Sequence, residues 1–238
     1  MNRRLWNRYK GTLIGSLVAV LVFALLYAIT QGAWPIGVSG TATTGVFGAA
    51  MALGEAVSAL RQFIAPQPDA ARFARVQAPT LTDYVHPGWM IAATILAVVG
   101  AGMSTALLLG VKPAALPVGL PLGAVCLLAV LAVAGVTVAA ALSSKFLAVP
   151  QPASSELELQ WDDALRAYAL RDLWIASIAL STAAFVAALS WLLDFSSPYS
   201  YLGLIVGLSP LVLLNLPVSR RPLSRLWQHS RASDPSRC

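Results

Sequence analysis

Charged residues are scarce in this chain of 238 residues, since Asp, Glu, Lys and Arg together make up only 11% of it. Soluble domains carry about 25% charged residues. With 58% hydrophobic residues and a mean hydropathy of +0.72, the composition excludes an ordinary water-soluble domain. Cysteine and histidine are equally rare, at two residues each. Their scarcity excludes a disulfide framework and a Cys/His metal cluster within one chain.

Catalytic and nucleotide-binding motifs are also missing from the sequence. It contains no His-Glu-x-x-His, no Gly-x-Ser-x-Gly and no phosphate-binding Gly-Lys-Ser/Thr loop. We therefore predict no enzymatic activity and no bound cofactor or metal. Specific nucleic-acid binding is not expected either, because Arg clusters beside membrane helices are explained more simply as topology anchors attracted to anionic lipid.

The chain does have long apolar runs. A helix needs about 20 mainly apolar residues to cross the hydrocarbon core. Five runs meet this requirement, at 12–30, 89–110, 118–142, 173–193 and 201–217. A sixth, at 41–60, is marginal because it is rich in Gly, Ala and Thr and contains Glu55. We predict an all-α, polytopic transmembrane helix bundle over residues 1–217.

The positions of Lys and Arg decide between five and six crossings. With six, fifteen of the sixteen basic residues lie on one side and only Lys112 on the other, whereas five crossings would divide them five against eleven. Cytoplasmic segments are enriched in Lys and Arg, so the sequence predicts six crossings with both termini in the cytoplasm. Residues 218–238 then form a basic cytoplasmic tail, which we expect to be disordered. Tyr84, Trp89 and Trp174 fall at the inner membrane surface, where an aromatic belt is expected.

A further pattern lies in the cytoplasmic segment between the fourth and fifth crossings. Ser155-x-x-Glu158 is a capping box, and it predicts an amphipathic helix over 155–172. The apolar face of this helix comprises Leu157, Trp161, Ala164, Leu165 and Tyr168, and the polar face includes Glu158, Asp162 and Arg166.

The segment that forms this helix is net acidic, whereas helices that lie on anionic lipid carry Lys and Arg on their polar face. We therefore expect it to dock a partner protein or the chain's own basic loop, with lipid adsorption disfavoured. The candidate docking residues are Trp161, Asp162, Asp163 and Arg166. The alternative is a solvated connector with internal ion pairs.

Two polar residues inside predicted crossings are candidates for an intramembrane polar site. Glu55 lies roughly two helical turns from the inner end of its crossing, and ionisable groups there often mark ion or proton pathways. Asn215 follows Pro210, which is expected to kink the last crossing. The alternatives are that Glu55 hydrogen-bonds Ser58 or reaches toward Arg61, and that the kink is a packing adaptation.

The stretch 160–172, Gln-Trp-Asp-Asp-Ala-Leu-Arg-Ala-Tyr-Ala-Leu-Arg-Asp, resembles a cytoplasmic segment of uncharacterised polytopic membrane proteins from high-GC bacteria. This resemblance implies a multi-pass protein of the bacterial inner (plasma) membrane, and it implies no site residues. The six-helix layout also resembles the permease subunits of ATP-driven (ABC-type) transporters, which contact their ATPase through cytoplasmic helices. That likeness implies a membrane-spanning transporter subunit with a cytoplasmic ATPase as partner. The alternative is a non-transporting scaffold or regulatory partner of a cytoplasmic protein, and a homo-oligomer is compatible with both.

Overall fold

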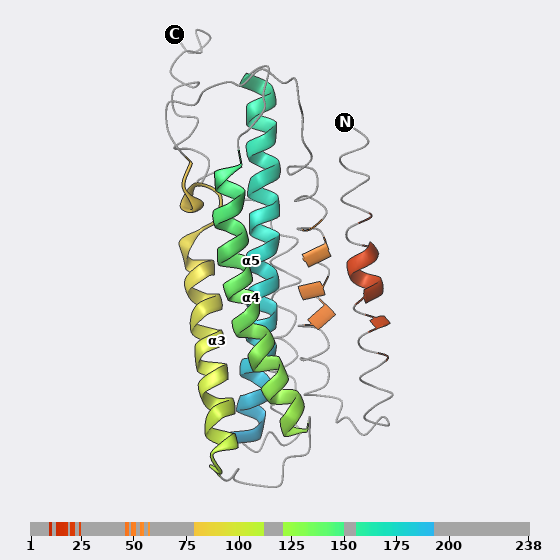
Figure 1. The fold of residues 1–238 in the computed structure, drawn as a ribbon, viewed down its shortest axis with the longest axis vertical. Coiled ribbons are helices and arrows are strands. Elements are labelled where there is room, and N and C mark those ends of the chain that lie inside the picture. Colours follow the sequence, from red (N-terminus) through yellow and green to blue (C-terminus); the bar gives the residue numbers. More distant parts are fainter. Residues whose placement is uncertain are drawn as a thin grey trace, which may run out of the picture.

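The computed structural model describes residues 79–111, 121–149 and 156–192 without a break, together with residues 10, 13–18, 20, 21, 24, 46, 47, 49, 50, 53, 54 and 57. The described elements are a short 3₁₀ helix, η1 (Leu81–Asp83), and three long helices, α3 (Pro87–Leu108), α4 (Leu122–Ala148) and α5 (Glu156–Leu192). Figure 1 shows the long helices running side by side along the long axis of the bundle. The all-α prediction is confirmed for this part of the chain.

Among the residues that the structure describes, three helices are long and apolar enough to cross a membrane: α3, α4 and the Leu159–Leu192 part of α5. At 1.5 Å per residue, the 22 residues of α3 span about 33 Å, close to the roughly 30 Å hydrocarbon core. They correspond to the crossings predicted at 89–110, 118–142 and 173–193. The apolar helices indicate a membrane protein.

The remaining predicted crossings fall partly or wholly outside the described residues. Within 12–30 and 41–60, the residues that the structure describes are helical. One of them, Ala49, is buried and packs against Ala176 and Ala179 of α5. Residues 201–217 and 218–238 lie outside the described part of the chain. Six crossings and two cytoplasmic termini therefore stay predictions.

The boundaries of α3 follow from local chemistry at each end. His86 precedes the helix and its Nδ1 accepts a hydrogen bond from the Gly88 main-chain nitrogen at 3.1 Å. Pro87 occupies the first helical position, where its missing N–H costs nothing. After the helix, Gly110 adopts a φ of 87°, the left-handed conformation that commonly terminates helices and that favours glycine.

The fifth predicted crossing and the predicted amphipathic helix at 155–172 are a single element in the structure. α5 is one unbroken helix of 37 residues, about 55 Å long. Its sequence contains no Gly or Pro that would interrupt it. Because the hydrocarbon core is only about 30 Å thick, the apolar second half, 173–192, is sufficient to cross it. If the hydrocarbon core encloses this apolar half, the first half of α5, residues 156–172, extends beyond it.

α5 is the most enclosed of the three helices. In its most apolar segment 78% of the residues are buried, against 28% for α3 and for α4. Gly100 of α3 lies against α5 so closely that a Cβ atom there would be 3.1 Å from the Phe185 main-chain nitrogen. Small residues permit such approaches between membrane helices.

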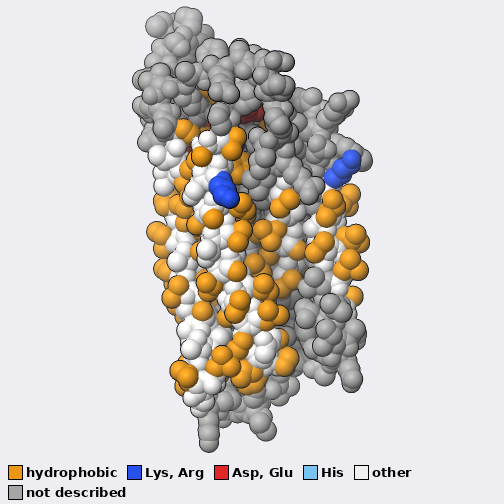
Figure 2. Space-filling view, in the orientation of Figure 1, with side chains coloured by type: hydrophobic (Ala, Val, Ile, Leu, Met, Phe, Trp, Pro, Cys, Tyr) orange, Lys and Arg blue, Asp and Glu red, His pale blue; other side chains and the backbone are white. Residues whose placement is uncertain are grey.

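Figure 2 shows hydrophobic side chains along the sides of the described helices, with Lys and Arg toward one end.

Candidate functional site

The charged side chains of the three long helices gather at one end of the bundle. This end is formed by the start of α3, the last turn of α4, which carries Lys145, and the first half of α5. Within α3, within α4 before Lys145, and within 173–192 of α5, the sequence has no Asp, Glu, Lys or Arg. The end cluster, as we call it, comprises the buried or half-buried residues Tyr84, Asp163, Arg166, Tyr168, Arg171 and Asp172.

The end cluster begins where the apolar part of α5 stops. There, the indole Nε1 of Trp174 donates to the Ser143 hydroxyl oxygen at 3.2 Å, joining α5 to α4. Asp163 lies eleven residues before Trp174, which corresponds to about 16 Å along the helix axis. With the hydrocarbon core placed on the charge-free half of α5, Asp163 and its neighbours therefore lie outside it.

Asp163 connects α5 to the segment that precedes α3. The Tyr84 hydroxyl donates to Asp163 Oδ1 at 2.9 Å, and both residues are buried, with exposed fractions of 2% and 0%. Tyr84 is held by η1, where its main-chain nitrogen donates to the Leu81 oxygen. Burying a polar group is costly unless it is hydrogen-bonded, so this bond offsets part of the cost of enclosing Asp163.

Arg166, one turn further along α5, caps the end of α4. Its Nη1 donates to the Phe146 carbonyl oxygen and its Nη2 to the Val149 carbonyl oxygen, each at 3.0 Å. The last carbonyls of a helix have no partner within that helix, and a positive charge is favourable at the negative end of the helix dipole. The guanidinium meets both needs, because its several donors fan out in one plane.

Arg171 and Asp172 form an ion pair lower in the cluster. Arg171 Nε and Nη2 donate to Asp172 Oδ1 at 3.1 and 3.0 Å, and both side chains are buried. The guanidinium carbon also lies 5.0 Å from the ring centroid of Tyr168, within the range of a cation–π contact. This pair keeps two charges neutralised where α5 leaves the apolar region.

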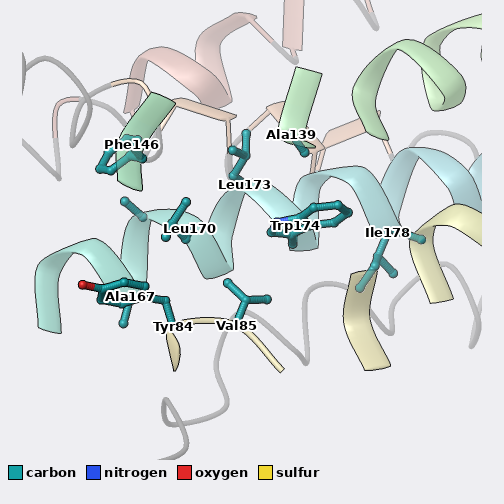
Figure 3. Packing of buried hydrophobic residues seen from close by; sticks show 11 residues of the cluster. Tyr84, Val85, Ala139, Phe146, Ala167, Leu170, Leu173, Trp174 and Ile178 are labelled. Atoms are coloured by element: carbon teal, nitrogen blue, oxygen red, sulfur yellow. The ribbon is translucent and has the colours of Figure 1, made fainter. Parts of the chain in front are cut away.

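Apolar side chains of the same region join the end cluster to the membrane part of the bundle. Figure 3 shows Phe146 and Ala139 of α4 on one side of α5, and Tyr84 and Val85 on the other. Leu170 of α5 belongs to the same buried layer and is 1% exposed. The first half of α5 is therefore packed between the segment before α3 and the end of α4.

The structure separates the four predicted docking residues. Asp162, Asp163 and Arg166 are 5%, 0% and 2% exposed, so these three side chains are turned into the bundle. Trp161 is 54% exposed and Leu157, one turn earlier, is 65% exposed. Asp163 and Arg166 are buried because the end of the bundle offers them polar partners, the Tyr84 hydroxyl and the α4 carbonyls. Docking by these residues stays a prediction.

Two aromatic residues predicted for the membrane-surface belt have a different place. Tyr84 and Trp174 are only 2% and 3% exposed, and each makes a hydrogen bond within the protein rather than lying at the lipid surface. Trp89 is half-buried against the same core. The sequence pattern did not distinguish a lipid-facing ring from a buried one.

The predicted intramembrane polar site is not among the described residues, since Glu55 and Asn215 both lie outside them. Leu53, two residues before Glu55, is half-buried against the cores around α5. Within the residues that the structure describes, no group of three His, Cys, Asp or Glu side chains could hold a metal ion.

Sequence reasoning missed two structural features for which signals were present and one for which there was none. Thr80-x-x-Asp83 is a capping box, and it positions Tyr84 directly after η1. Ala93, Ala97, Gly100 and Ser104 recur at helical spacing and form the buried face of α3. Nothing in the sequence indicated that Arg166 would cap α4, because that contact depends on how two helices pack.

Comparison with known proteins gives no relative for this arrangement. No family model matches the chain, and neither a curated protein nor a solved structure is detectably similar to it.

Proposed function

We propose that the protein is the membrane-spanning subunit of a transporter and that it works with a cytoplasmic ATPase. The observation that supports this best is the continuity of α5, a single helix of 37 residues that joins a half carrying charged residues to a charge-free, apolar half. A displacement imposed on the first half would pass into the membrane, because no Gly, Pro or break interrupts the helix.

In this proposal the ATPase binds the exposed apolar face at the start of α5. Leu157 and Trp161 are one turn apart, and both are more than half exposed. Trp161 lies about 20 Å along the helix from Trp174, beyond the reach of lipid tails. Tryptophan is among the residues that contribute most to protein interfaces, whereas the carboxylates of Asp162 and Asp163 are enclosed and are not part of the proposed contact.

The membrane half of α5 has the contacts needed to pass a movement to its neighbours. Gly100 allows α3 to approach the α5 backbone near Phe185, and the Ser177 hydroxyl donates to the Gly135 carbonyl oxygen of α4 at 3.2 Å. The backbones of α5 and α3 therefore lie close together, and α5 is hydrogen-bonded to α4. A shift of α5 would change both helices together.

A second candidate is a non-transporting scaffold that presents a fixed surface to a cytoplasmic protein. It is favoured by a different observation, the attachment of the first half of α5 at two places by Asp163 and Arg166. A helix held to the ends of both neighbours is suited to serve as a rigid platform. The two candidates differ in the partner that they require.

Site-specific photo-crosslinking in native cells distinguishes these candidates. A photoreactive amino acid at Leu157 or Trp161 should yield an adduct whose identity is read by mass spectrometry. An ATPase adduct supports the transporter, and an adduct with a regulator or another non-ATPase protein supports the scaffold. Leu127, an exposed residue of α4, is the control, because there only lipid adducts are expected. Lipid adducts alone at Leu157 and Trp161 would contradict both candidates.

A further inference from the structure

We infer that Asp163 and Arg166 form a latch, which holds the first three turns of α5 (156–166) against the neighbouring helices. When the latch opens, these turns would detach while the membrane-crossing helices stay packed. Asp163 attaches them to the segment before α3 through Tyr84, and Arg166 attaches them to the end of α4. Both attachments come from a single turn of one helix.

The chemistry of the attachments supports a reversible contact. Each is a hydrogen bond involving a charged side chain, and each lies outside the charge-free part of the bundle. Water can replace such a bond once the groups separate, because it solvates the carboxylate, the guanidinium and the exposed carbonyl oxygens. Separation therefore exchanges one set of hydrogen bonds for another and does not leave the groups unsatisfied.

The contacts directly below the latch are mainly apolar, apart from the Arg171–Asp172 ion pair. Leu170 and Trp174 belong to a buried apolar layer that continues into the membrane part of the bundle through Ala139 and Ile178. Apolar burial of this kind is not replaced by water. We therefore place the limit of an opening just after Arg166, where this apolar layer begins on α5 with Ala167 and Leu170.

Leu159 provides a reporter for the opening. It lies within the latched turns and is only 6% exposed. Leu170 lies below the latch and is 1% exposed. An open latch would expose position 159 to solvent and leave position 170 buried. Because no partner protein is involved, this inference can fail or succeed independently of the proposed transporter or scaffold role.

The test is maleimide labelling of single cysteines in nanodiscs. The native thiols are first removed as Cys126→Ala and Cys238→Ser, and Leu159→Cys or Leu170→Cys is then introduced. Adding Tyr84→Phe or Arg166→Gln should raise the labelling rate at position 159 by about tenfold or more, since hydrogen bonds to charged groups are the stronger ones. The rate at position 170 should stay unchanged.

A matched control is Thr137→Val, which removes a hydroxyl bonded only within its own helix, to the Val133 carbonyl oxygen. It should change neither labelling rate. If Arg166→Gln prevents folding, Tyr84→Phe still tests the latch, because it deletes only one hydroxyl. The inference is overturned if labelling at position 159 does not rise in any folded variant. It is equally overturned if positions 159 and 170 become accessible together, since the opening would then not be local.

Discussion

The Tyr84 hydroxyl donates to Asp163 Oδ1 at 2.9 Å, although the two residues are 79 positions apart in the sequence. Between them lie the whole of α3 and the whole of α4. This buried bond therefore joins the segment before α3 to α5. Its strength can be measured directly, because each partner has a substitution of nearly the same shape.

A double-mutant cycle with Tyr84→Phe and Asp163→Asn should reveal coupling between these residues. Each single variant loses or weakens the bond. The double variant should therefore lose less free energy of unfolding than the two single variants lose together. We expect a coupling free energy of about 1 to 2 kcal/mol, as for hydrogen bonds to charged groups and neighbouring residues generally. The measurement is the free energy of unfolding in detergent micelles. Strict additivity would mean that the bond contributes nothing.

Gly100→Ala should destabilise the protein, because the new methyl group would lie 3.1 Å from the Phe185 main-chain nitrogen and would force α3 away from α5. Overpacking of this kind costs roughly 1 to 3 kcal/mol. Gly102→Ala is the matched control in the same helix, since a Cβ there meets nothing within 4 Å. It should be neutral or slightly stabilising. Thermal unfolding in nanodiscs compares the two, and equal melting temperatures would contradict the close approach.

Reversing the charge of Asp162 tests whether its carboxylate is buried in the bundle or belongs to a solvated connector. Asp162 is 5% exposed, so Asp162→Lys should cost on the order of 3 kcal/mol or more through an enclosed, mismatched charge. Lys145 is exposed in the last turn of α4, and Lys145→Glu should cost less than about 1 kcal/mol. Similar losses of thermal stability for both reversals would favour the connector.

The predicted threading can be tested with reporter fusions after Ala70 and Ser230. Six crossings place both positions in the cytoplasm, so a fluorescent reporter should be active at each and a periplasmic phosphatase reporter inactive. The physical reason is the fifteen-to-one division of Lys and Arg. An active phosphatase at Ser230 would remove the crossing at 41–60 and leave five.

The sequence was sufficient to predict α3 and α4, because a long charge-free run has few alternatives to a membrane-crossing helix. The first half of α5 was harder. Its periodicity predicted that Trp161 and Asp162 lie on different faces, but periodicity states only that two faces differ. Which face is buried depends on the partners that the rest of the fold offers. Here those partners are the Tyr84 hydroxyl and the α4 carbonyls, whose positions exist only after α3 and α4 have packed.

The cap that Arg166 places on α4 also bears on the order in which the protein is made. Phe146 and Val149 leave the ribosome well before Arg166, which is 20 and 17 residues further along the chain. α4 is thus inserted before its last carbonyls receive the guanidinium that later satisfies them. We expect the α3–α4 pair to remain incompletely fixed during insertion, and its assembly to be completed when α5 arrives.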